Sequence, residues 1–114
     1  MWKPVLPAIA ISVLLSIPQA LSQDLSLDDL LGRWCGSESD YTFTESKLVV
    51  SFHNGQPERT LEIQRVESTP RDIEVIWEPP YKNTIFEKFT PDKRSMRQAA
   101  TRDGSGPVRF FRRC

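Results

Sequence analysis

From residue 32 to the end of the chain, apolar and polar side chains alternate with a period of two. Turn-forming residues interrupt this alternation about every 8 to 12 residues, which is typical of a meander of short β-strands. The interruptions supply Pro, Gly, Asn or Asp where the backbone must reverse direction. We therefore expect strands over residues 32–38, 40–45, 47–53, 59–66, 72–78, 83–89, 95–101 and 107–113. This pattern predicts an all-β fold, a small antiparallel up-and-down β-barrel of about eight short strands, and leaves an open sandwich as the alternative.

The same alternation predicts which side chains face the interior. We expect the following to be largely buried: Trp34, Tyr41 or Phe43, Val50, Ile63, Val75, Trp77 and Phe89. We expect Lys47, Arg59, Glu62, Glu74 and Lys88 to be exposed. In the sixth strand Glu87 shares the parity of Ile85 and Phe89, which would place a carboxylate inside the barrel. A bulge or a register slip at that point is the favoured reading.

Two segments do not fit a simple strand. Residues 26–32 predict one or two helical turns, with Ser26 as the cap, acidic residues in the first turn and Gly32 at the end. Residues 90–101 begin with Thr90-Pro91, which can start a helix. We favour a hairpin there, because a helix would leave the barrel one strand short.

The first 22 residues differ from the rest of the chain. They carry one charge, Lys3, then an apolar run too short to span a bilayer, then Pro18 and the small-residue pattern that signal peptidase requires. We therefore expect residues 1–22 to be a secretory signal peptide, residues 23–114 to form a single domain, and the protein to be periplasmic or secreted. The alternative, a buried core helix, is disfavoured by the prolines.

Net charge and cysteine content limit the possible functions and compartments of the protein. The segment after residue 22 has a formal charge of about minus one, which argues against a general binder of nucleic acid or anionic membranes. The two cysteines, Cys35 and Cys114, fall in the first and last expected strands, and in an exported chain they predict a disulfide rather than two free thiols. Closing a loop of roughly 80 residues stabilises the fold by about 4 to 4.5 kcal/mol in the chain-entropy model. We expect a monomer with no free thiol.

The beginning of the first strand carries a short motif. Gly32 and Trp34, after a short helical turn, resemble the Gly-x-Trp signature of the lipocalins and their relatives, and the chain ends in an arginine-rich strand. This resemblance implies an up-and-down barrel in which the tryptophan closes one end and an arginine of the last strand packs across its ring. If Cys35 faces Cys114 across neighbouring strands, Trp34 shares a side with Arg113 and not with Arg112, so Arg113 is the expected partner and Arg109 the second choice.

No group of residues predicts catalysis. His53 is the only histidine and lies in an expected turn, the cysteines are expected to be paired, and no Gly-x-Ser-x-Gly or phosphate-binding loop occurs. We therefore expect no enzyme activity, no metal site and no cofactor. The arginines near the C-terminus form either a patch for an anionic partner or, as we favour, a solvated strand face plus the residue that covers Trp34. They are Arg94, Arg97, Arg102, Arg109, Arg112 and Arg113.

Two binding functions remain. The first is an exported barrel that holds a small apolar or amphipathic ligand, with candidate lining residues Tyr41, Phe43, Val50, Phe52, Val75, Trp77 and Phe89. The second is an envelope protein-binding module, such as a lysozyme or protease inhibitor, that presents a surface loop at low entropic cost, with candidates Pro80, Tyr81 and Lys82. A hollow interior would favour the ligand, and a filled one would favour the surface loop.

Overall fold

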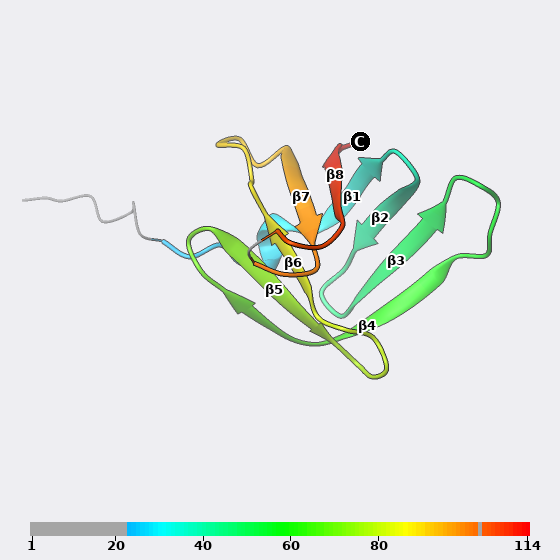
Figure 1. Ribbon diagram of the computed structural model, residues 1–114, viewed down its shortest axis with the longest axis horizontal. Helices are drawn as coiled ribbons and strands as arrows, with labels where there is room; N and C mark the ends of the chain where they lie inside the picture. The colour runs from blue at the N-terminus through cyan, green and yellow to red at the C-terminus, as the bar shows by residue number, and fades with distance from the viewer. Residues whose placement is uncertain (1–22, 103) are drawn as a thin grey trace, which may run out of the picture.

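The computed structural model describes residues 23–102 and 104–114, and the expected signal peptide lies outside them. A 3-10 turn, η2 (Leu27–Asp29), precedes eight strands that pair in chain order and close into an antiparallel barrel (Figure 1). The strands are β1 (Gly32–Gly36), β2 (Ser39–Phe43), β3 (Lys47–Phe52), β4 (Arg59–Ser68), β5 (Asp72–Trp77), β6 (Thr84–Glu87), β7 (Ser95–Ala99) and β8 (Val108–Arg113). The barrel closes where β8 pairs with β1. No helix within the described ranges has the length and apolar character to cross a membrane.

The predicted fold class is confirmed, since each expected strand is present within a few residues of its predicted bounds. The contested segment contains β7, which pairs with both β6 and β8, so the hairpin reading is confirmed. The N-terminal helical turn is shorter than expected. It ends before Gly32, which instead begins β1 with a φ of 103°. A φ in this range favours glycine, and a Cβ there would also approach the Arg113 guanidinium to 3.0 Å.

Most of the expected interior positions are buried. Trp34, Tyr41, Phe43, Val50, Val75 and Trp77 are buried, while Ile63 and Phe89 are half-buried. Among the positions expected to be exposed, Arg59, Glu62 and Lys88 are exposed, and Lys47 and Glu74 are half-buried. On most strands the alternation therefore predicts the correct face, and it overstates how completely the interior side chains are covered.

The sixth strand departs from its expected parity. Phe86, and not Ile85, joins the hydrophobic core, and its ring packs edge-on against Phe43 at 5.3 Å between centroids. Glu87 is buried but outside the core, where it pairs with Arg97 of β7. Lys88 has a φ of 58°, which interrupts the strand geometry and lets Phe89 turn back toward Trp34. The inward-facing residues here are therefore Phe86 and Phe89, and not the alternating set Ile85, Glu87 and Phe89.

The barrel interior is filled at the end where β1 begins. Trp34 is fully buried there, its indole N–H donates to the Leu30 carbonyl over 2.9 Å, and Phe89 contacts its edge. The Arg113 guanidinium carbon lies 4.0 Å from the centroid of the Trp34 ring, which is the arrangement that parity predicts. Arg113 also donates to the carbonyls of Leu31 and Asp29. One side chain thus covers the tryptophan and satisfies the carbonyls of the adjoining turn.

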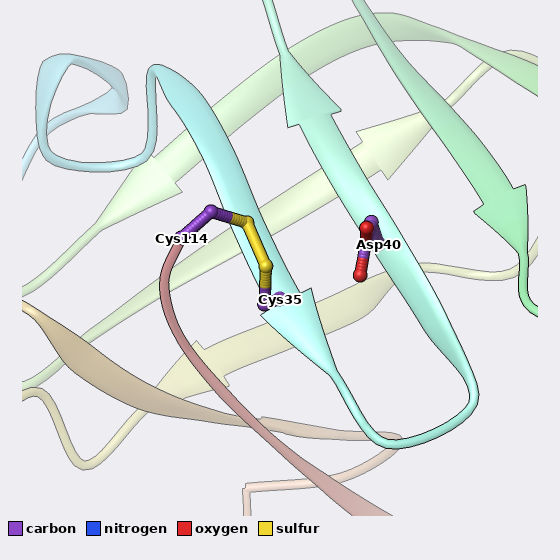
Figure 2. A group of neighbouring side chains, drawn as sticks. All are labelled: Cys35, Asp40 and Cys114. Carbon is purple, nitrogen blue, oxygen red and sulfur yellow. A yellow bond between two sulfur atoms is a disulfide. The ribbon is translucent and has the colours of Figure 1, made fainter.

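The disulfide joins Cys35 of β1 to Cys114, directly after β8, with 5.1 Å between their Cα atoms (Figure 2). The expected disulfide is confirmed, although the two cysteines do not lie directly opposite each other in the strand pairing. Cys35 lies opposite Arg112, and Cys114 continues to a hydrogen bond with the Arg33 carbonyl. The bond is therefore diagonal. Because the diagonal neighbour has the same parity as the direct one, Trp34 still shares its side of the sheet with Arg113.

Candidate functional site

The other half of the barrel is hollow. A cavity of about 670 Å³ opens between the loops that join β1 to β2 and β3 to β4, and residues of every strand from β2 to β8 line it. A volume of this size falls within the usual range for small-molecule sites in proteins. The interior is therefore divided into a packed end around Trp34 and an open end that faces solvent.

The floor of the cavity is mostly apolar. It is formed by side chains that point inward from β2, β3, β4 and β5, namely Tyr41, Leu48, Val50, Phe52, Leu61 and Trp77. The Trp77 indole N–H donates to the Thr84 hydroxyl over 2.9 Å, so its only polar atom is satisfied and its ring is left as an apolar wall. Such a surface can bury an apolar ligand but offers little to hold a polar one in place.

Polar groups are concentrated at one side of the floor. The Tyr41 hydroxyl donates to Gln98 Oε1 of β7 over 3.0 Å, across the interior from one strand to another. Burial raises the pKa of Tyr41, and its hydrogen bond to Gln98 and the charges of Arg109 and Arg59 oppose that rise. Tyr41 therefore stays a neutral hydrogen-bonding group at physiological pH. Both arginines are close enough to act on its hydroxyl.

Two arginines stand at the mouth on inward-facing positions. Arg59 lies opposite Val50 in the β3–β4 pairing, and its guanidinium is 5.6 Å from the Phe52 ring centroid. Arg109 lies opposite Gln98 in the β7–β8 pairing and has the parity of Phe111. Its partner is Glu38, at 3.4 Å, with both side chains largely exposed. The mouth thus combines two guanidinium groups with a single weakly held carboxylate.

His53 connects two loops at the same mouth. Its Nε2 lies 2.8 Å from Asp40 Oδ1, its Nδ1 lies 3.2 Å from the Ser37 carbonyl, and its backbone N–H donates to Glu38. The hydrogen bond to Asp40 is the main cause that raises the pKa of His53, and the same bond lowers the pKa of Asp40. Because both ring nitrogens face acceptors, the imidazolium form satisfies both contacts. His53 is therefore a link between loops and not an isolated turn residue.

Asp40 also lies beside the disulfide. Cys35, Asp40 and Cys114 place their ligand-type atoms within 4.8 Å of one another, with Asp40 on the strand next to Cys35 (Figure 2). The two sulfur atoms are bonded to each other, so they are not available as thiolate ligands for a metal ion. Asp40 instead holds Arg33 at 2.9 Å and His53 at 2.8 Å. This group is an outer-face ion-pair cluster.

The structure divides the sequence-predicted ligand residues between the two halves of the barrel. Tyr41, Val50, Phe52 and Trp77 line the cavity. Phe43 and Val75 are packed in the core, and Phe89 covers Trp34 at the closed end. These three residues therefore border the packed end and not the cavity, because parity tells which side a residue faces and not how far along the barrel it lies.

Sequence reasoning missed several lining residues. Leu48 and Leu61 share the parity of Val50 and Ile63, so the alternation could have identified them. Gln98, Arg59 and Arg109 could not be found in this way, because a polar side chain facing inward gives no hydrophobic signal. Apart from Arg109, the arginines of the C-terminal cluster do not line the cavity. Arg113 covers Trp34, Arg97 pairs with Glu87, Arg102 pairs with Asp72 and Glu74, and Arg94 and Arg112 are exposed.

The candidate partner loop follows β5 and lies at the same end of the barrel as the mouth. Pro80, Tyr81 and Lys82 are exposed, and Tyr81 keeps 40% of its surface accessible. None of the three lines the cavity. The loop is therefore available for an external contact but does not contribute to the hollow interior.

No protein-family model matches the chain, and comparisons with curated proteins and with solved structures find no significant match. The chain is therefore assigned by its fold, a closed eight-stranded antiparallel barrel compatible with lipocalin-like barrels, and not by family.

Proposed function

We propose that the protein binds a small apolar or amphipathic molecule in the open half of its barrel. The observation that carries this proposal is the 670 Å³ cavity with its largely apolar floor, in a barrel whose other half is densely packed. A packed end with a hydrogen-bonded Trp34 and a disulfide gives the rigid scaffold on which a preformed pocket depends. The protein would act as a monomeric binding protein without a cofactor.

We further propose that the protein works outside the cytoplasm, in the periplasm or as a secreted protein. The disulfide supports this location, because disulfides persist mainly in oxidising compartments. The composition of residues 1–22 is the second support, since it has the order of a charged start, an apolar run and a small-residue cleavage site.

A titration with N-phenyl-1-naphthylamine, a neutral dye that fluoresces in apolar surroundings, tests the binding proposal. Leu61→Trp places a large ring in the cavity and should abolish dye binding, whereas Thr60→Trp adds the same ring on the outer face of β4 and should leave it unchanged. Far-ultraviolet circular dichroism confirms that both variants fold. Equal dye binding by the two variants would mean that the dye does not enter the barrel, and the proposal would be wrong.

The second candidate function is an envelope protein-binding module that acts through residues 79–83. The exposed ring of Tyr81 favours it, because aromatic side chains are enriched at binding hot spots. Tyr81→Ala distinguishes the two functions. It should leave dye binding unchanged under the ligand proposal, and it should weaken capture of a lysozyme or protease if the loop is the active surface.

A further inference from the structure

The mouth of the cavity has an uneven charge distribution. Among the residues that line it, Glu38 is the only carboxylate, and it faces Arg109 from 3.4 Å with 73% of its side chain exposed. Arg59 has no carboxylate within 4.0 Å anywhere in residues 23–102 and 104–114. An exposed ion pair of this kind contributes little free energy. Two guanidinium groups are thus left with most of their hydrogen-bonding capacity unused.

The strand pairing also places both arginines beside the polar side of the cavity floor. Val50 of β3 pairs with Tyr41 on one side and with Arg59 on the other. Gln98 accepts a hydrogen bond from the Tyr41 hydroxyl and lies opposite Arg109 in the β7–β8 pairing. Arg59 is held over the Phe52 ring, which limits its freedom without occupying its N–H donors. Both arginines line the cavity together with Tyr41 and Gln98, so two positive charges border the polar side of the apolar floor.

Guanidinium groups pair with carboxylates and phosphates through two parallel hydrogen bonds. A neutral oxygen can accept single hydrogen bonds from these groups but cannot pair with their charge, and a cationic ligand would be repelled. We therefore propose that the ligand is an apolar chain ending in an anionic oxygen headgroup, a carboxylate or a phosphate, held between Arg59 and Arg109 with its chain on the floor formed by Leu48, Leu61 and Trp77. This assignment rests on the proposed function, since it places the chain in the same cavity.

Displacement of N-phenyl-1-naphthylamine by four ligands of equal chain length tests the headgroup. Dodecanoate and monododecyl phosphate should displace the dye at concentrations roughly tenfold or more below those of 1-dodecanol and dodecyltrimethylammonium, because charge-assisted hydrogen bonds add that much affinity. All four are used below their micelle-forming concentrations. The stronger of the two anions identifies the headgroup class.

Four variants test which residues cause the preference for anions. Arg59→Gln and Arg109→Gln should each remove most of the preference for anions, so that dodecanoate displaces the dye little better than 1-dodecanol does. Arg112→Gln, on the outer face of the same strand as Arg109, is the matched control and should behave like the unaltered protein. Glu38→Gln removes the carboxylate that pairs with Arg109 and should strengthen dodecanoate binding about two- to fivefold.

The outcomes separate the two proposals. If the dye binds and 1-dodecanol competes as well as dodecanoate, the headgroup assignment is overturned and the proposed function stands. If the anions are preferred but Arg112→Gln removes the preference as fully as Arg109→Gln, binding is to the outer surface and the assignment is likewise overturned. If none of the four ligands displaces the dye, or the dye itself does not bind, both proposals are wrong.

Discussion

Trp34 and Arg113 form the most densely connected contact of the closed end. The arginine lies against the ring at 4.0 Å, donates to two carbonyls of the segment before β1, and is half-buried. Burial lowers the pKa of Arg113, but an arginine stays protonated at any pH in which the protein is folded. A guanidinium is required here because it stacks on a ring and donates in its own plane at the same time.

We expect Arg113→Ala to lower the free energy of unfolding by about 2 to 4 kcal/mol, from the lost cation–π contact and two carbonyls left without their donor. Arg113→Lys should recover only part of this, since an ammonium cannot make the planar contacts. Arg112→Ala is the control, because Arg112 is exposed on the outer face. Urea denaturation measures all three. A larger loss for Arg112→Ala than for Arg113→Ala would contradict the side assignment.

At the residue scale, the sequence predicted that Arg113 covers Trp34. It did not predict that Arg59 and Arg109 line the cavity. The parity argument for Arg113 depends only on which strands are neighbours and on the disulfide, and both could be inferred from the chain. Arg59 was expected to be exposed, and it is, yet its side chain borders the cavity. Exposure and orientation toward a ligand are different properties, and alternation reports only the burial of apolar groups.

At the scale of elements, alternation and turn-forming residues predicted where the strands lie. They did not predict the points at which the inward and outward positions shift by one residue. Lys88, with a φ of 58°, resets the phase after β6, and the β4–β5 pairing shifts register between Ile63 and Arg65. Lysine rarely adopts a positive φ, so a lysine at this position gives no sequence signal that the alternation is interrupted here. The turn at Lys88 lets Phe89 lie inside together with Phe86, while Glu87 lies on the outer face and pairs with Arg97.

A contact that depends on pH joins the β3–β4 loop to β2 near the mouth. The pKa of His53 is raised above its ordinary value of 6.5, and the pKa of Asp40 is lowered below 3.8, each chiefly by the hydrogen bond between them. The His53 contribution to stability is therefore present below about pH 6.5 and is lost as pH rises through the folded-state pKa. The Asp40 contribution is present above about pH 4 and is lost as pH falls.

His53→Asn should consequently destabilise the protein between about pH 4 and 6.5 and have a smaller effect at pH 8.5. Arg33 continues to hold Asp40 in this variant, so the difference reports the imidazolium alone. The measurement is the unfolding midpoint in urea for both proteins across this range, with the histidine pKa followed by NMR. An effect of His53→Asn that grows with rising pH would show that the neutral imidazole is the stabilising form.

For the whole molecule, the division into a packed end and a hollow end is the property that the sequence could not predict. Parity identifies which side chains face inward, but the volume left between them depends on barrel diameter and strand stagger. A chain of this size has a small core, and a 670 Å³ cavity reduces it further. The stability of the fold therefore depends strongly on contacts outside the open half, among which the closure of the barrel is decisive.

Closure depends on the pairing of β1 with β8, which involves only three residue pairs, from Trp34↔Arg113 to Gly36↔Phe111. The disulfide joins these strands across a sequence separation of 79 residues. In the chain-entropy model a loop of that length stabilises the folded state by about 4.5 kcal/mol, mainly by restricting the unfolded chain. For a small domain this is a large part of the total stability.

We therefore expect dithiothreitol to lower the free energy of unfolding by about 4 kcal/mol and to leave the reduced protein only marginally folded. The variant with both Cys35→Ser and Cys114→Ser should start from the same low stability and show no response to dithiothreitol, which separates the loss of the bond from other effects of the reductant. Urea denaturation with and without reductant measures both, and mass spectrometry after alkylation verifies the thiol state. A loss below about 1 kcal/mol would mean that the three β1–β8 pairs, with Arg113 over Trp34, hold the barrel closed by themselves, and the chain-entropy account of its stability would be wrong.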